Sequence, residues 1–248
     1  EVLKPFLIII LATILCDIKS NILFKYLISI FLISFISLLL IAQPDIGQTL
    51  LVIFCWAVLI FTSGINIYIL LAIFIAGASL LTYLIIYVPR FDYIQGRIFS
   101  FFNRETGTHN FQSDKAIESI TSGGFFGKGI GEGVLKNRVP EAHTDYIISV
   151  ISEEFGVVAI MLILLLFLIL IYMVFKKISF ETNDKVKLIL IGSISLILMQ
   201  ATIHVGVNIR LFPTTGMTLP FLSYGGSSII STSILGGIIL NLTKRKIT

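Results

Sequence analysis

Long hydrophobic runs separated by shorter polar stretches dominate the chain. The runs lie at residues 2–15, 23–42, 48–62, 65–88, 146–175, 188–208 and 227–243. A run near 20 residues can cross a hydrocarbon core of about 30 Å as a helix, whereas a transmembrane barrel would show short alternating segments. The pattern therefore predicts an all-α, polytopic membrane helix bundle with about seven transmembrane helices, forming a single membrane domain over residues 1–248.

The longest polar stretch, residues 89–145, is too long for a simple connector. Loops longer than about 15 residues are usually functional or disordered. This one is rich in phenylalanine, which is unusual for a solvated linker. We expect it to fold against the membrane surface, partly as amphipathic helices, one of which covers Ser113–Ile120.

Clusters of basic residues predict the orientation of the bundle, because cytoplasmic loops carry an excess of Lys and Arg. They gather at three places, which are Lys19 and Lys25, then Lys176, Lys177, Lys185 and Lys187, and finally Lys244, Arg245 and Lys246. These places should be cytoplasmic. Alternation then puts residues 43–47, 89–145 and 209–226 on the outer side, so that 89–145 is a large extracytoplasmic loop.

Composition agrees with a membrane protein. Of the 248 residues, 56% are hydrophobic and only 13% are charged, whereas a soluble domain carries about 25% charged residues. The net charge of +4 is small and spread over loop ends, which argues against nucleic-acid binding. The two cysteines, Cys16 and Cys55, lie away from the large loop, so neither a structural disulfide nor a cysteine metal site is expected.

Few polar groups are available for chemistry, and Asp145 stands out among them. It lies where the outer loop meets a hydrophobic run, beside His143 and Thr144. A carboxylate at that boundary can act as a general base or hold a divalent cation. The alternative is a plain helix start, in which Thr144 or Asp145 caps free backbone N–H groups.

Other charged residues have similarly open interpretations. Glu153 and Glu154 follow Asp145 into the hydrophobic run, and acids there normally face a protein cavity or water, unless the helix starts later and both lie at the interface. Glu1 and Lys4 are three residues apart, a spacing that permits an ion pair on a helix. Solvated charges at a chain end are the simpler explanation from spacing alone.

Two segments are rich in backbone-breaking residues. The glycine-rich segment 123–133 lacks the Ser or Thr after its lysine that a nucleotide-binding P-loop needs, so no nucleotide is expected. It allows close backbone approach, and its amides and Lys128 can meet an anionic substrate. The segment 213–228 combines Pro, Gly and hydroxyl residues between two membrane segments, and we expect a re-entrant element lining a cavity.

Several motifs, arranged in family order across nearly the whole chain, resemble the SEDS family of cell-wall polymerases, which includes FtsW, RodA and SpoVE. The motifs are Gln43–Gly47, Gly127–Gly129, Pro140–Asp145, Glu153–Gly156 and Leu219–Ser228. Family members have ten membrane helices. The resemblance therefore implies that the seven here are the last seven and that the chain is N-terminally truncated.

Within the family, the FtsW branch is the most similar. Pro140–His143 and Gly206–Asn208, followed by Pro213–Pro220, look more like that branch than like RodA. The resemblance implies a peptidoglycan glycosyltransferase that polymerises lipid II, a disaccharide-pentapeptide on undecaprenyl pyrophosphate. The reaction would take place at the outer face of the bacterial cytoplasmic (inner) membrane, at the division septum.

The resemblance also implies site residues and partners. Asp145 aligns with the family's essential acid, as catalyst or as ligand of a divalent cation (Mg or Mn), and Glu1 and Lys4 match a family Glu/Lys pair. Arg97, Lys128 and Lys4 are candidate partners of the pyrophosphate, with Glu1 holding Lys4. The other candidate substrate-binding residues are Gln112, His143, Thr144, Glu153, Asn208, Ser223, Tyr224, Gly225, Gly226 and Ser227. The implied partners are a class B penicillin-binding protein, other divisome proteins and membrane lipid.

Three other functions stay open at this point. A transporter, or flippase, of lipid II also uses buried polar groups and broken elements at membrane depth. A scaffold that only recruits the penicillin-binding protein would need no catalytic acid. An elongation-type RodA paralogue would share the chemistry of the FtsW branch and differ in its place in the cell cycle.

Overall fold

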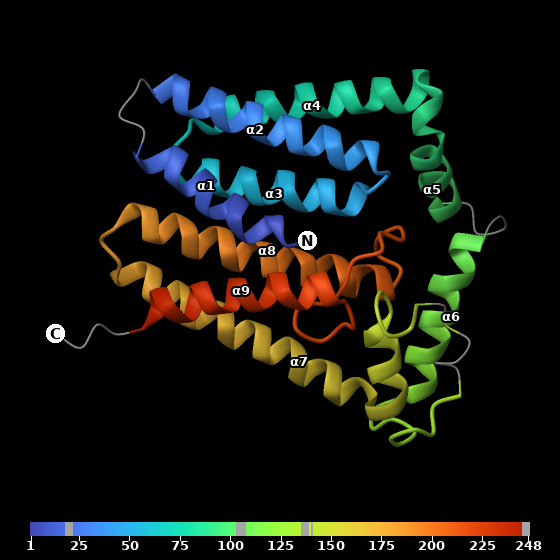
Figure 1. Cartoon of the computed structure of the whole chain (residues 1–248). Helices are drawn as coiled ribbons and strands as arrows, with labels where there is room; N and C mark the ends of the chain where they lie inside the picture. The colour runs from blue at the N-terminus through green and yellow to red at the C-terminus, as the bar shows by residue number, and fades with distance from the viewer. Residues whose placement is uncertain (18–21, 103–107, 135–138, 140, 245–248) are drawn as a thin grey trace. The chain divides into compact units, whose positions relative to one another are not determined.

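The computed structural model describes residues 1–17, 22–102, 108–134, 139 and 141–244, and within these residues it contains helices and no β-strand (Figure 1). The helices are α1 (Leu3–Asp17), α2 (Ile22–Ala42), α3 (Ile46–Thr62), α4 (Ile67–Tyr87), the 3-10 helix η1 (Pro89–Phe91), α5 (Asp92–Phe102), α6 (Thr108–Gly123), α7 (Ile147–Phe180), α8 (Asp184–Asn208) and α9 (Gly226–Thr243). The predicted all-α class is therefore confirmed.

All seven hydrophobic runs form helices. Five of them, α2, α4, α7, α8 and α9, are long and apolar enough to cross a membrane, while α1 and α3 are apolar but shorter. A backbone in lipid must satisfy its own N–H and C=O groups, and a helix does so within a single segment. Long uninterrupted apolar runs are therefore reliable predictors of helices.

The chain divides into two compact units. The first comprises Glu1–Asp92, Tyr172–Met199 and Ile230–Thr248, and in it α1, α2 and α3 pack on one another. Gly192 of α8 lets that helix approach closely, since a Cβ there would lie 2.8 Å from the Cγ2 of Ile8. The thiol of Cys55 donates to the carbonyl of Gly192 at 3.5 Å.

The second unit comprises Tyr93–Ile171 and Gln200–Ile229, so it holds α5, α6, the first part of α7, the end of α8 and the segment before α9. The predicted amphipathic helix over 113–120 is confirmed and is longer than expected, since α6 spans Thr108–Gly123. The unit thus contains most of the large polar loop and the segment 213–228, in which the candidate chemistry lies.

Helix α7 is broken at Gly156, where φ is 78° and ψ is −179°. The glycine-rich segment replaces the missing helical hydrogen bonds. Its amides at Lys128 and Gly129 donate to the carbonyls of Glu153 and Glu154, at 2.9 and 3.0 Å. The expectation that these amides meet an anionic substrate is therefore wrong for these two, because α7 already uses them.

The break requires a glycine both in α7 and in the glycine-rich segment. A Cβ on Gly127 would lie 2.1 Å from the carbonyl oxygen of Glu154, and one on Gly156 would lie 2.2 Å from that of Phe125. Both glycines also have φ near 78°, a conformation that other residues adopt only under strain. The predicted close backbone approach is confirmed, and its partner is α7.

Candidate active site

A tight turn places Asp145 just before α7. Glu141 has a positive φ of 54°, and its carbonyl oxygen accepts hydrogen bonds from the amides of Thr144 and Asp145, each at 3.1 Å. The hydroxyl of Thr144 donates to the Glu141 carboxylate at 2.9 Å. The turn therefore closes on itself before the helix begins at Ile147.

Three successive carbonyl groups of this turn are held by the end of α8 and by the segment between α8 and α9. The His143 carbonyl accepts from the amide of Tyr224 at 3.0 Å, and the Thr144 carbonyl accepts from the Ser223 hydroxyl at 2.6 Å. The Asp145 carbonyl accepts from the side-chain amide of Asn208 at 3.0 Å. We call these three bonds the carbonyl clamp. It fixes the backbone of Asp145 without using its carboxylate.

The carboxylate of Asp145 receives no hydrogen bond from the described part of the chain, so it does not cap α7. It lies beside Gly216, where an added Cβ would come within 3.5 Å of Oδ2. Partial burial, and then the negative charge of Glu141, raise the pKa of Asp145 from 3.8 to about 6. A base that is stronger than an ordinary carboxylate and still ionised at neutral pH suits general-base catalysis.

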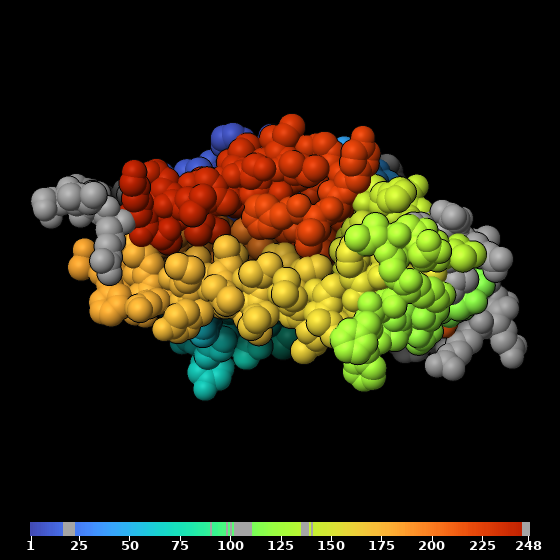
Figure 2. Space-filling view, turned by 90° about the horizontal axis from the view of Figure 1, so that it is seen from below, coloured from blue at the N-terminus to red at the C-terminus, as the bar shows by residue number. Residues whose placement is uncertain are grey.

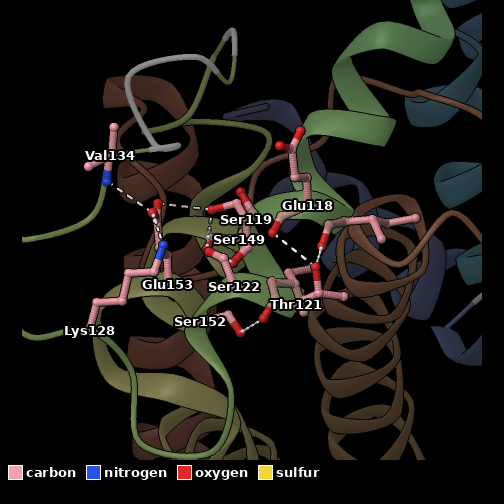
Figure 3. A network of polar contacts seen from close by, with 11 residues as sticks. Glu118, Ser119, Thr121, Ser122, Lys128, Val134, Ser149, Ser152 and Glu153 are labelled. Carbon is pink, nitrogen blue, oxygen red and sulfur yellow. Dashed lines mark hydrogen bonds and ion pairs between the residues drawn. The ribbon is translucent and has the colours of Figure 1, made fainter.

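Glu153 lies at the centre of a buried network (Figure 3). Its carboxylate is 0% exposed and accepts from the Ser119 hydroxyl at 3.1 Å and from the Val134 amide at 2.9 Å. The ammonium of Lys128 lies 3.4 Å away. The two open interpretations of this acid are thereby decided, because it faces neither solvent nor lipid but the inside of the protein.

This burial changes the role that the sequence gave to Glu153. A buried carboxylate with partners on both oxygens offers no surface to a ligand, so we assign it the positioning of the glycine-rich segment against α7. Lys128 is half-exposed and keeps a face for an anion, although one side of its charge is balanced by Glu153.

The segment after α8 turns back along that helix. Gln200 donates from its side-chain amide to the Thr218 carbonyl at 3.0 Å, and His204 Nδ1 lies 2.7 Å from the Met217 carbonyl. Gln200 lies two turns before the end of α8, which is roughly 12 Å along the axis. The segment is thus irregular chain that packs back along a helix long and apolar enough to cross a membrane, as the expected re-entrant element would, and its lining of a cavity stays a prediction.

Arginines connect this element to the large polar loop. Arg97 of α5 donates to the Thr214 carbonyl at 3.4 Å, two residues before the glycine that faces Asp145. Arg210, which follows α8 with a φ of 58°, forms an ion pair with Asp114 of α6. Both cations therefore belong to the same unit as Asp145.

The remaining predicted residues of this unit differ in exposure. His143, Tyr224, Gly226 and Ser227 are exposed, Gln112, Thr144 and Gly225 are half-buried, and Ser223 and Asn208 are buried. Ser223 accepts from the Leu219 amide as well as donating to Thr144, and Asn208 also donates to the His204 carbonyl. We therefore assign Ser223 and Asn208 to positioning the turn and not to contact with substrate.

Glu1 and Lys4 form the predicted ion pair in the first unit. Lys4 Nζ lies 2.8 Å from Glu1 Oε2, and both side chains are largely buried, so they are not simply solvated charges at a chain end. The side-chain amide of Gln48, on α3, also donates to Glu1. The pair therefore joins the first turn of α1 to the first turn of α3.

Sequence reasoning missed several of these residues. Glu141 raises the pKa of Asp145, Gln48 completes the Glu1–Lys4 pair, and Arg210 joins the loop after α8 to α6. Glu141 lies inside a motif already singled out and Gln48 directly follows one, so their polarity was a usable signal. Arg210 has no such local signal.

Comparison with known proteins places the chain in a family. The model of a family described as "Cell cycle protein", covering FtsW, RodA and SpoVE, matches residues 1–247. The chain belongs to the FtsW/RodA/SpoVE family.

Among curated members of this family, the chain is 35% identical over 223 residues to a probable peptidoglycan glycosyltransferase FtsW of Caulobacter vibrioides, covering 87% of this chain and 55% of that protein. It is 37% identical over 221 residues to the protein of the same name from Francisella salina, covering 85% and 53%. The chain thus spans about half the length of these relatives.

Solved structures of the FtsW/RodA/SpoVE type share the fold. A chain of a peptidoglycan synthase complex, described as coordinating polymerization and crosslinking, matches with a TM-score of 0.74 at 25% identity, over 99% of this chain and 69% of that one. The rod shape determining protein RodA of Thermus thermophilus matches with a TM-score of 0.65 at 27% identity, over 99% and 64%. This chain is therefore a multi-pass membrane protein of the family, and the predicted resemblance is confirmed.

The described residues do not build a complete metal site. They contain no group of three His, Cys, Asp or Glu side chains that could hold an ion. Near Asp145 the other acid is Glu141, whose carboxylate accepts from Thr144. The described residues therefore do not hold a cation by protein ligands alone, and a cation here would need ligands from the substrate.

Proposed function

We propose that this chain provides the catalytic centre of a peptidoglycan glycosyltransferase that polymerises lipid II at the outer face of the cytoplasmic membrane. The observation that carries the proposal is the Asp145 carboxylate, which is held by its backbone, left without a hydrogen-bond partner by the described residues, and raised in pKa to about 6. Family membership and the names of the curated relatives support the same reaction.

In this reaction Asp145 acts as a general base. It takes the proton of the acceptor sugar's 4-hydroxyl while that oxygen attacks the anomeric carbon of the donor sugar. The bond between that carbon and the pyrophosphate oxygen breaks, and the pyrophosphate leaves with the electron pair. The substrate is already activated by its pyrophosphate, so neither a nucleotide nor a covalent enzyme intermediate is required.

Cations near the site offset the charge that develops on the leaving group. Lys128 keeps an exposed face beside Glu153, and Arg97 of α5 donates to the carbonyl of Thr214, on the segment that leads to Gly216. We assign the pyrophosphate to these two side chains within the second unit. Lys4, with Glu1 and Gln48, is the candidate of the first unit.

A divalent cation (Mg or Mn) is a further part of the proposal. Mg²⁺ commonly binds through one or two carboxylates together with substrate phosphates and water. In this alternative to the general-base role, a cation would arrive with the pyrophosphate and use Asp145 as its protein ligand. Its role is tested by the metal dependence of activity in the wild-type protein.

The proposed setting is the division septum, with a class B penicillin-binding protein that crosslinks the new strands and with other divisome proteins. The support is the fold shared with a chain of the peptidoglycan synthase complex, and the FtsW name of the curated relatives. Co-purification of the tagged protein with its penicillin-binding partner, and its position in dividing cells, test this part.

The test of the activity uses the protein in lipid nanodiscs, together with its penicillin-binding partner whose crosslinking is blocked by a β-lactam. Fluorescent lipid II is supplied, and glycan strands are resolved by gel. We expect strands from the wild type and none from Asp145→Asn. The matched control is Glu118→Gln, which removes an exposed acid paired with Lys115 on the surface of α6.

Two results would overturn the proposal. Strand synthesis at the wild-type rate by Asp145→Asn would remove this residue from the mechanism. Absence of strands from the wild type, combined with transfer of lipid II across vesicle bilayers, would identify a transporter instead of a polymerase.

A further inference from the structure

The glycine-rich segment presents two phenylalanines to the outside. Phe125 and Phe126 are 75% and 85% exposed, although they are among the largest apolar side chains in the chain. Exposed apolar side chains of this size, gathered with Ile130 and Val134 on one loop, are typical of a surface that meets a partner or a membrane.

The position of this loop along α7 identifies what it meets. Residues 157–175 of α7 contain no charged residue, and Glu154 and Lys176 stand on either side. Nineteen helical residues rise about 28 Å, close to the roughly 30 Å of a bilayer's hydrocarbon core. The first turn after Gly156 must therefore lie at one edge of that core.

The loop is bonded to that same turn. The amides of Val157 and Val158 donate to the carbonyls of Gly124 and Phe125, at 3.0 and 3.3 Å. Val157 and Val158 are themselves exposed, so their outer surface continues into that of the loop. Figure 2 shows the light-green surface, which includes α6 and the start of the loop, adjoining the yellow surface of α7.

The backbone of the loop is prepared for an environment with little water. The hydrogen bonds from Val157 and Val158 run from α7 to the loop, and those from Lys128 and Gly129 run from the loop to α7. Unpaired backbone groups are costly near hydrocarbon, and these bonds remove part of that cost. A loop that pointed into open water would gain little from such pairing.

We propose that Phe125 and Phe126 insert into the interfacial region of the bilayer and anchor the glycine-rich segment there. The occupant of this surface is lipid, and the evidence is its continuity with the membrane-spanning face of α7. The anchor would fix the depth of the loop, which contains Lys128 and binds Glu153 of α7. It does not depend on the reaction proposed above.

Depth-dependent fluorescence quenching tests the anchor. Trp56 is the single tryptophan and is buried, so Trp56→Phe gives a dark background. In that background the test variant is Phe126→Trp. Leu165→Trp, on the exposed face in the middle of α7, and Glu118→Trp, on the polar helix α6, serve as deep and aqueous references. Each protein is reconstituted in bilayers with lipids brominated near the glycerol end or near the middle of the acyl chain.

The two bromine positions should quench the three tryptophan variants in different orders. Bromine near the glycerol end should remove about half of the Phe126→Trp emission and bromine at mid-chain should remove less, since aromatic side chains prefer the interface. Leu165→Trp should show the reverse order, and Glu118→Trp should respond to neither.

Two outcomes would refute the anchor. One is a Phe126→Trp emission that no brominated lipid quenches and that iodide in the water quenches as strongly as the Glu118→Trp emission. The other is an emission that shifts to shorter wavelength only after the penicillin-binding partner is added, because the surface would then be a protein interface.

The Phe125→Ser/Phe126→Ser protein, if it folds in detergent, should lose thermal stability less in detergent than in bilayers.

Discussion

The raised pKa of Asp145 makes a quantitative prediction about the pH dependence of strand synthesis. Burial and the charge of Glu141 raise the pKa from 3.8 to about 6. General-base catalysis needs the ionised form, so activity should increase as pH rises through 6.

The size of the effect follows from the ionised fraction. With a pKa of about 6, about 91% of Asp145 is ionised at pH 7 and about 9% at pH 5, so the rate should fall about tenfold. With an ordinary pKa of 3.8, about 94% would remain ionised at pH 5 and the rate would hardly change.

Glu141→Gln provides the internal check. It removes the negative charge that is the second cause of the shift and keeps the shape of the side chain. The acid limb of the rate profile should move to lower pH by less than the full shift, because burial is the larger cause. The assay is the initial rate of strand synthesis at low lipid II concentration between pH 5 and 8. A flat wild-type profile, or an acid limb that moves to higher pH in Glu141→Gln, would refute the reasoning.

Two further predictions concern the parts that hold the site. Ser223→Ala removes one bond of the carbonyl clamp and should lower the free energy of unfolding by about 1–3 kcal/mol and reduce the rate of strand synthesis. Ser79→Ala, on the exposed surface of α4, should change neither quantity. Gly127→Ala should lower the thermal unfolding temperature far more than Gly131→Ala, because both have a positive φ but only the first would bring a Cβ against the Glu154 carbonyl. Equal melting shifts for the two alanine variants, or an unchanged Ser223→Ala, would count against these assignments.

The hydrophobic pattern predicted the helices well because lipid leaves the backbone few choices. Helix α2 begins at Ile22 and ends at Ala42, against a predicted run of 23–42. Where the bounds differ, a local interaction explains it. The third helix starts two residues earlier than predicted because Asp45 accepts a hydrogen bond from the Gln48 amide and so caps it.

The role proposed for Asp145 was indicated by its place at a boundary, and the motifs around it led to the family. The residues that hold it were harder to interpret. Thr144 and Ser223 are 79 residues apart, and a hydrogen bond over that distance depends on how the segments pack, which no local pattern records. Asn208 and Ser223 were therefore assigned to substrate although their side chains bind backbone.

The break in α7 was missed for a related reason. A glycine within an apolar run is compatible with a continuous helix, and the run gave no signal that residues 123–129 would pair with it. Only the packing of that segment shows that Gly156 adopts a φ of 78° and that Glu153 is buried.

The most direct test of the central claim is the rate of a single round of glycosyl transfer by Asp145→Asn with lipid II bound, measured beside lipid II binding. Loss of a general base typically costs 10²–10⁴-fold in rate. We predict a loss in this range with binding of lipid II nearly unchanged. Transfer by Asp145→Asn at the wild-type rate would contradict the account.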